Sequence, residues 1–109
     1  MSWDWGQAQT AMAECAAEQE RSEQNMRDAG ADAAVAKREY QRALAVRIVE
    51  LKAKGNAVTA CETIAKGEHD ISQLRFEKDL AEATYRAACA ANYRHSANRA
   101  DAVELAKWA

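Results

Sequence analysis

Apolar and small side chains recur every three or four positions over the first half of the chain, from about residue 7 to residue 54. This spacing predicts one long amphipathic helix whose narrow apolar face follows a heptad seam. The seam runs through Met12, Cys15, Gln19, Ser22, Met26, Ala29, Ala33, Ala36, Tyr40 and Ala43. After Tyr40 the stripe shifts to Leu44, Ile48 and Leu51, which is typical of a stutter in a coiled coil.

The start of this helix and a glycine inside it carry further signals. Asp4 followed by Gln7 forms a capping pair at the amino terminus. Gly30 admits two interpretations: one long helix that can bend, or a break with Asp32 capping a second piece, which would make a three-helix bundle. We favour one helix because the seam keeps its phase across the glycine.

The segment over residues 55–67 is a connector with a short helix of its own. Thr59 and Glu62 form a T-x-x-E capping box, and Gly67 suits the left-handed position after a helix end. These signals predict a helix over about residues 60–66. Glu68 and Asp70 then open a third helix, which runs to about residue 107.

The third helix carries two apolar stripes on different faces. The first contains Ile71, Leu74, Ala81, Tyr85, Ala88, Cys89, Tyr93, Ala100 and Val103. The second contains Phe76, Leu80, Ala83, Ala87 and Ala90. One neighbouring helix cannot cover both faces, so the pattern predicts a contact beyond a simple hairpin, made by a bent-back amino-terminal helix or by another molecule.

The two long helices complement each other as an antiparallel hairpin. If Lys54 faces Glu68, the numbers of paired residues sum to about 122, and large side chains face small ones along the seam. The pairs are Tyr40 with Ala81, Tyr85 with Ala36, and Tyr93 with Ala29 and Gly30. We therefore expect an all-α, coiled-coil-like hairpin with a short connector helix, forming a single domain over residues 1–109.

Composition supports helix but supplies few large apolar side chains. The chain has 109 residues, of which 27 are alanine and only 14 are Leu, Ile, Val or Phe. Alanine is the strongest helix former, but a core this lean predicts dependence on a partner or a homo-oligomer.

Charge is unevenly distributed along the chain. The net charge of −2 divides into −5 over residues 1–36 and +3 over residues 37–109. The acidic third presents Glu14, Glu18, Glu20 and Glu23, which could meet a basic surface on a protein partner or simply solvate an exposed helix.

Two further sets of residues are candidates for binding. Lys37, Arg38, Arg42, Lys52 and Lys54 make the second half of the first helix basic and could contact phosphates, although glutamates dilute the field. Trp3, Trp5 and Trp108 lie at the same end of the expected hairpin. That aromatic end is either a core clasp or an exposed binding surface.

The residues offer little for catalysis or metal binding. Cys15, Cys61 and Cys89 form no CxxC motif, and no secretory signal precedes them, so we expect free thiols in a reducing cytoplasm. His69 and His95 lie about 39 Å apart along one helix and cannot share a metal. We expect no enzyme activity, no metal, no cofactor and no membrane partner.

A resemblance covers about two thirds of the chain, residues 40–108. It is carried by Tyr40-x-x-Ala43, Arg47-Ile48-x-Glu50-Leu51-Lys52, Thr59, Ala65-Lys66-Gly67-Glu68, Leu74, Asp79-x-Ala81 and Tyr85. This run resembles small uncharacterised helical proteins of tailed phages and prophages, which are often encoded among early genes near recombination or replication functions. The resemblance implies phage or prophage origin and carries over no catalytic or binding residues.

Together these features predict a non-catalytic protein of a bacterial host cytoplasm that works by binding a macromolecule. The lead hypothesis is an accessory or inhibitor that docks on a nucleic-acid-processing or host-defence complex, such as a CRISPR effector. The alternative is a self-associating structural coiled coil or virion assembly component. A third hypothesis is a direct nucleic-acid binder.

Overall fold

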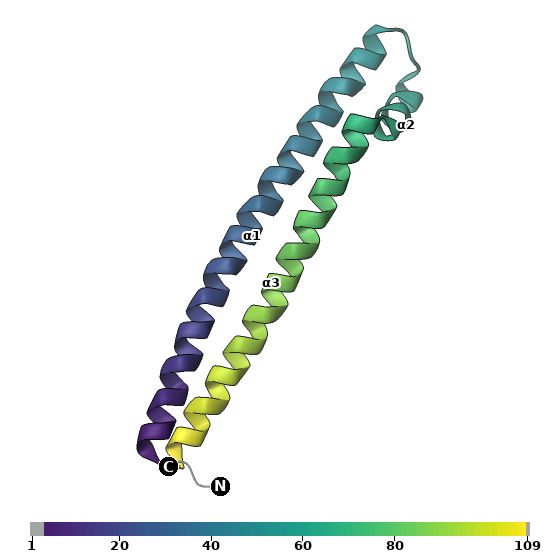
Figure 1. Cartoon of the computed structure of the whole chain (residues 1–109). Helices are drawn as coiled ribbons and strands as arrows, with labels where there is room; N and C mark the ends of the chain where they lie inside the picture. The colour runs from purple at the N-terminus through teal and green to yellow at the C-terminus, as the bar shows by residue number, and fades with distance from the viewer. Residues whose placement is uncertain (1–3, 109) are drawn as a thin grey trace. The chain divides into compact units, whose positions relative to one another are not determined.

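The computed structural model describes residues 4–108 and contains three α-helices in chain order. α1 spans Trp5–Ala53, α2 spans Val58–Gly67 and α3 spans His69–Lys107 (Figure 1). No strand occurs within residues 4–108, and α2 joins two antiparallel helices, so the chain is an all-α helical hairpin. The predicted helix bounds differ from the observed ones by at most two residues.

α1 begins at a reciprocal cap and continues unbroken for 49 residues. The backbone N–H of Gln7 donates to Asp4 Oδ1 at 2.7 Å, and the backbone N–H of Asp4 donates to Gln7 Oε1 at 3.1 Å. These two bonds satisfy backbone donors that the first turn of a helix leaves free. Gly30 lies inside the helix, so the three-helix bundle that a break there would produce does not form.

The seam predicted for α1 is confirmed by burial. Every predicted member from Met12 to Leu51 is at least half-buried, and Ser22, Tyr40 and Leu51 are nearly inaccessible to solvent. The spacing of three and four residues keeps these side chains on one side of a helix with 3.6 residues per turn.

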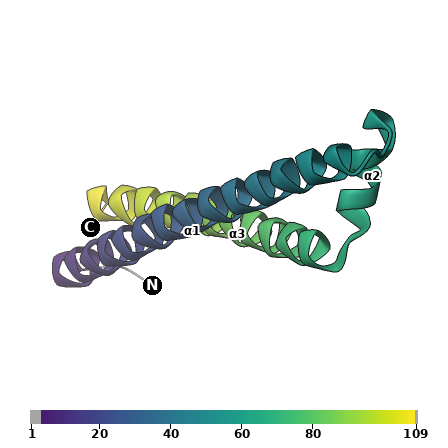
Figure 2. The same cartoon turned by 90° about the horizontal axis from the view of Figure 1, so that it is seen from above.

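The chain packs as two compact units. Unit 1 combines Met1–Ala29 with Tyr85–Ala109, and unit 2 comprises Gly30–Thr84. Within unit 2, α2 connects the end of α1 to the start of α3 (Figure 2). The buried residues of the core there are Leu51, Cys61 and Ala65, with Leu44 and Ile48 packed against them.

The turn after α1 depends on Gly55, whose φ of 93° is in the left-handed region that glycine adopts without strain. The N–H of Gly55 donates to the carbonyl of Lys52, and the N–H of Asn56 donates to the carbonyl of Leu51. This nested pair is a Schellman motif, which satisfies the last carbonyls of the helix. The Asn56 side chain adds a second bond to the same Leu51 carbonyl at 3.0 Å.

Two predictions about α2 are wrong. The residue that caps α2 is Ala57, with no side-chain hydrogen bond, because the helix begins at Val58 and Thr59 is already inside it. Glu62 pairs instead with Lys66, one turn later on the same helix, at 2.7 Å. Gly67 is the last residue of α2 and does not adopt a positive φ, because the chain leaves α2 through extended backbone at Glu68.

The predicted register of unit 2 is also wrong. Glu68 contacts Arg47 rather than facing Lys54, which places the start of α3 about two turns further back along α1. The reason is that α2 packs against the last turns of α1 and buries Leu51. That space is therefore closed to α3.

In unit 1, the last part of the predicted α3 stripe is wrong. Tyr93 is 76% exposed, so it does not pack against Ala29 and Gly30, and Ala100 and Val103 are exposed as well. The protected positions of α3 in this unit are Tyr85, Ala88, Cys89, Ala91, Asn92, His95, Ser96, Ala102 and Ala106. Beyond Cys89, short and polar side chains occupy the seam in place of the expected Tyr93, Ala100 and Val103, and the Tyr93 ring keeps its hydroxyl in water.

Candidate interaction surfaces

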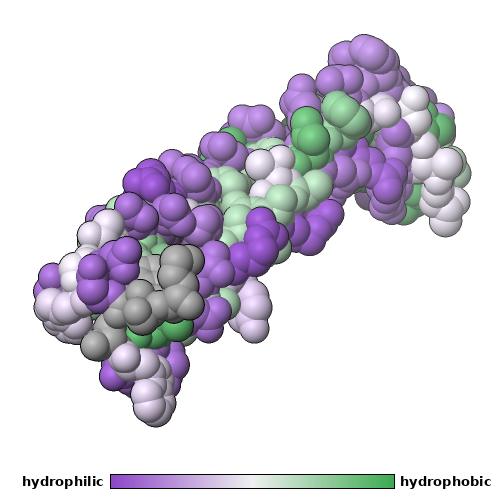
Figure 3. Space-filling model, turned by 60° about the horizontal axis from the view of Figure 1, so that its bottom comes forward, coloured by the Kyte–Doolittle hydropathy of each residue, from purple (hydrophilic) through white to green (hydrophobic). Residues whose placement is uncertain are grey.

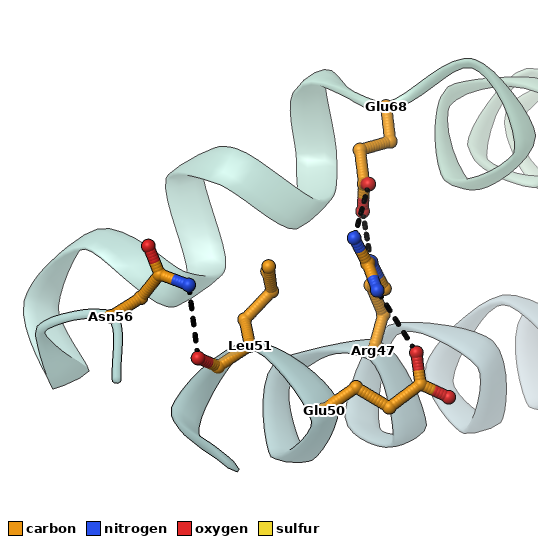
Figure 4. A network of polar contacts seen from close by, with 5 residues as sticks. All are labelled: Arg47, Glu50, Leu51, Asn56 and Glu68. Carbon is orange, nitrogen blue, oxygen red and sulfur yellow. Dashed lines mark hydrogen bonds and ion pairs between the residues drawn. The ribbon is translucent and has the colours of Figure 1, made fainter. Parts of the chain in front are cut away.

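Arg47 links α1 to the start of α3 in unit 2 (Figure 4). Its guanidinium donates from Nε to Glu68 Oε1 at 2.6 Å and from Nη2 to Glu68 Oε2 at 2.8 Å. A third bond joins Nη1 to Glu50 Oε2 at 3.0 Å. Two parallel bonds between a planar guanidinium and a carboxylate fix both position and orientation, so this group clamps the α2–α3 junction onto α1.

The clamp shifts the pKa of both partners toward the charged forms. Hydrogen bonds from Arg47 hold the pKa of Glu68 below its usual value, and the charge of Lys54 adds a smaller effect. The pKa of Arg47 is raised by its hydrogen bonds to Glu68 and then Glu50. Sequence reasoning missed this pair because the register that it assumed placed Glu68 opposite another residue.

A groove of about 870 Å³ lies beside the clamp in unit 2. Ala43, Val46 and Ile71 contribute its apolar lining. Around them lie the charged or titratable side chains of Glu39, Arg42, Arg47, Glu50, Glu68, His69 and Asp70. Val46 is 53% exposed there, so the groove leaves an apolar surface accessible to another molecule.

The helices of unit 1 are held together by polar contacts. The Gln19 amide donates from Nε2 to the Ser96 hydroxyl at 2.7 Å, and Arg99 donates to Gln19 Oε1 at 3.2 Å. His95 Nδ1 lies 3.6 Å from Glu18 Oε2, within ion-pair distance when the imidazole is protonated but too long for a hydrogen bond. The predicted seam includes Gln19, whereas its polar partners on α3 were not predicted, because the stripe expected on that helix consists of apolar positions.

Three buried polar atoms in this seam have no hydrogen-bond partner: the hydroxyl of Ser22, the side-chain oxygen of Asn92 and Nδ1 of His95. Such groups lose their hydration without compensation, which weakens packing. A shallow depression of about 300 Å³ borders Ser22 and His95 and is also lined by Arg21 and Asn25. The seam of unit 1 thus contains polar side chains, whereas the buried core of unit 2 is formed by Leu51, Cys61 and Ala65.

The four predicted acidic residues do not share one face of α1. Glu18 lies beside His95, whereas Glu20 and Glu23 line a different depression together with Arg21 and Arg27. A separation of two or five residues turns a side chain to another side of an α-helix. Glu14 is exposed and lies one turn before Glu18, on the same flank of α1. The acids are thus divided between the two flanks of the seam and interleaved with arginines.

The predicted basic residues Lys37, Arg38, Arg42, Lys52 and Lys54 are all exposed. Arg38 and Arg42 lie one turn apart and share a side of α1. Glu39 and Glu50 line the groove that Arg42 also borders. Phosphate groups near this surface would therefore meet alternating charges.

The predicted aromatic end is exposed where the structure describes it. Trp5 is 57% exposed and Trp108 is 84% exposed, so these two rings do not form a buried clasp. Trp3 lies outside the described residues. Leu105, 46% exposed, adds an apolar side chain to the same unit.

The second stripe predicted on α3 is also exposed. Phe76 is 61% and Leu80 is 56% exposed, while Ala83 and Ala87 follow them in the exposed class. We call these four residues the outer face of α3. Figure 3 shows on the side in view how hydrophobic and weakly hydrophobic residues lie between hydrophilic ones at the protein surface. Sequence reasoning identified the outer face because its spacing is a property of the helix alone.

Among residues 4–108, no group of three His, Cys, Asp or Glu side chains is arranged to hold a metal ion. Within the same residues, none of the helices is long and apolar enough to span a bilayer. Cys61 is fully buried in the core of unit 2, where its thiol donates to the carbonyl of Ala57 at 3.2 Å. This contact makes Cys61 a packing residue.

Comparison with known proteins found no matching family model, no matching curated protein and no matching solved structure.

Proposed function

We propose that this chain is a non-catalytic protein-binding module that docks on its partner through exposed apolar helix surfaces. The observation that carries this proposal is the exposure of Phe76 and Leu80, at 61% and 56%. In the same unit, Leu51 and Ile71 are 4% and 6% exposed. Unit 2 therefore buries large apolar side chains where it has an element to cover them, and the outer face has none.

The energy available from covering such side chains is sufficient for recognition. Burying a Phe or Leu side chain completely contributes about 1.5–3 kcal/mol, and a few residues of this kind dominate typical protein interfaces. Phe76 and Leu80 lie one turn apart on α3 and can enter the same partner surface.

The titratable groups with shifted pKa values support a structural role. Arg47 and Glu68 bind each other, and Lys78 bonds to Asp79, which raises the pKa of the Lys78 ammonium. The Lys78 ammonium also lies 5.5 Å from the centre of the Tyr40 ring, a cation–π contact between α3 and α1. The shifts of Arg47 and Glu68 come from a contact between α1 and the α2–α3 junction, whereas the Lys78 shift comes mainly from Asp79, its neighbour on α3.

The finer proposal concerns the partner. The excess of acid over residues 1–36 and the resemblance to phage proteins favour an accessory or inhibitor of a nucleic-acid-processing or host-defence complex, acting inside a bacterial host cell. Glu14 and Glu20 are exposed and available for such a contact, whereas Glu18 is within ion-pair distance of His95.

The proposal is tested by capturing partners from a bacterial lysate treated with nuclease, using the tagged wild-type chain and two matched variants. F76S/L80S makes the outer face polar. V58S makes a similar change at Val58, which is 69% exposed at the start of α2. Circular dichroism verifies that each variant stays helical.

A specific complex that wild type and V58S retain and F76S/L80S loses supports the proposed function. Capture that all three chains share equally, or no capture at all, overturns it. A further variant, E14Q/E18Q/E20Q/E23Q, tests the finer proposal. Weaker, less salt-sensitive capture of a nucleic-acid-processing complex supports it, and unchanged affinity overturns it.

A further inference from the structure

The outer face of α3 has the spacing of a second heptad seam. Phe76, Leu80, Ala83 and Ala87 follow one another at intervals of four, three and four residues, and all four are exposed. Because α3 is one continuous helix from His69 to Lys107, these positions share a side of it by helix geometry alone. Such a stripe is the kind of surface that packs against another helix.

The order of large and small residues in this stripe makes it complementary to itself. We propose that a second copy of this chain covers the outer face, with the two α3 helices antiparallel and a two-fold axis between residues 81 and 82. In that register Phe76 lies against Ala87 of the second copy, and Leu80 lies against its Ala83. Each large side chain fills the space that an alanine leaves, as close helix packing requires. This inference rests on the proposed function in taking the outer face as a docking surface, and it adds a second copy of the chain as an occupant of that surface.

Charges beside the stripe favour the same register. Asp79 and Arg86 lie on one flank of the stripe, and antiparallel pairing about this axis brings Asp79 of each copy next to Arg86 of the other. Asp79 also bonds to Lys78 of its own chain at 2.9 Å, and its side chain is still 57% exposed. Two interchain ion pairs, each between an aspartate and an arginine, therefore border the apolar contact.

Other arrangements of the same two helices are unfavourable. Shifting the antiparallel register so that Phe76 faces Leu80 places Asp79 against Asp79 and Glu77 against Glu77 of the second copy, and like charges repel. Parallel pairing places Phe76 against Phe76, where the two rings are crowded, and Ala83 against Ala83, where the two short side chains leave a gap. Size and charge thus select one symmetric dimer.

The contact is short, because the four residues of the outer face span about three turns of helix. It therefore falls at the small end of protein interfaces, and we expect a dimer dissociation constant of roughly 10–100 μM. Sedimentation velocity of the full chain between 5 and 500 μM measures this association directly.

A charge-swap cycle tests the register. D79R places two arginines side by side across the interface and R86D places two aspartates side by side, so each single variant should weaken the dimer at least about tenfold. The double variant D79R/R86D restores opposite charges and should return to within about threefold of wild type. The pair between Asp79 and Lys78 within one chain is lost in both D79R chains, so only the interchain pair explains the recovery.

E77K is the matched control, because it also reverses one charge on α3 but lies on the other flank, near the uncharged Thr84 of the second copy. It should change the dissociation constant less than about threefold. A chain that stays monomeric up to 500 μM overturns the inference, and so do single swaps without effect or a double swap without recovery.

The two proposals fail separately. A monomeric chain whose partner capture still depends on Phe76 and Leu80 overturns the second-copy inference and leaves the proposed function standing. A chain that dimerises with the predicted charge dependence but captures no other protein supports the inference and overturns the proposed capture of a different partner.

Discussion

Truncation of Leu51 is the most direct test of how unit 2 is held together. Leu51 is 4% exposed and packs with Cys61 and Ala65, both fully buried, at the point where α2 folds back on α1. Leu51→Ala removes the equivalent of three buried carbon groups, which at about 0.8 kcal/mol each predicts a loss of about 2.4 kcal/mol.

The cavity left by the substitution adds to this loss. Leu-to-Ala changes in well-packed cores cost about 2–5 kcal/mol, depending on how far the neighbours can relax. Leu44 and Ile48 border this core and are only half-buried, so they can move into the space. We therefore expect about 2.5–3 kcal/mol, near the low end of the range.

Urea denaturation followed by circular dichroism measures this loss at low micromolar protein. With a urea dependence of about 1.5 kcal/mol per molar, the midpoint should fall by roughly 1.5–2 M. Leu80→Ala is the matched control, because it removes the same atoms from a side chain that is 56% exposed. Since alanine also favours helix, the control should lose less than about 1 kcal/mol.

Equal losses in the two variants would refute the assignment of Leu51 to the core. A loss below about 1 kcal/mol for Leu51→Ala would also refute it, because such a value is typical of a surface position.

Three further predictions concern backbone and charge. Gly55→Ala should lower the free energy of unfolding by about 1 kcal/mol, because the φ of Gly55 is 93°. Gly67→Ala should be neutral or stabilising by up to about 1 kcal/mol, because Gly67 has open space around it and no positive φ. A Gly67 variant that is as unstable as the Gly55 variant would contradict this reasoning. The pKa of Glu68 is lower in the folded state, so the stability that its carboxylate adds to the fold is present above the unfolded pKa of about 4.3 and is lost as pH falls through the folded pKa. The urea midpoints of wild type and E68Q should therefore differ at pH 7 and converge near pH 2. A difference that stays constant with pH would refute the clamp. Asp4→Ala removes the carboxylate that accepts a hydrogen bond from the backbone N–H of Gln7, so amide hydrogen exchange in the first turn of α1 should become faster. Unchanged exchange rates would disprove the role of this cap.

The seam of α1 could be predicted because it depends only on local geometry. Residues from Met12 to Leu51 recur at the period of an α-helix, and a helix places them on one side whatever lies against it. The outer face with Phe76 and Leu80 was predictable for the same reason. The cap at Asp4 and Gln7 was predictable because both partners lie within one turn.

The register between the helices was not predictable in this way. It depends on how far α2 folds back, and burial of Leu51, Cys61 and Ala65 decides that. No local signal in the sequence reports that contact, so Glu68 was expected opposite Lys54 and instead binds Arg47. The end of the α3 stripe failed for a related reason: among many alanines, the period alone could not show that the seam passes through Asn92 and His95 rather than Tyr93.

The sequence by itself therefore determined three helices, their bounds within two residues, the inner seam of α1 and an uncovered apolar stripe on α3. These features follow from propensity and periodicity, which act over a few residues. Only the tertiary structure decided which residues meet across the helices: the Arg47 clamp, the buried Cys61 and the polar seam of unit 1. Those contacts join positions far apart in the chain, and the volume and charge of the packed side chains select them.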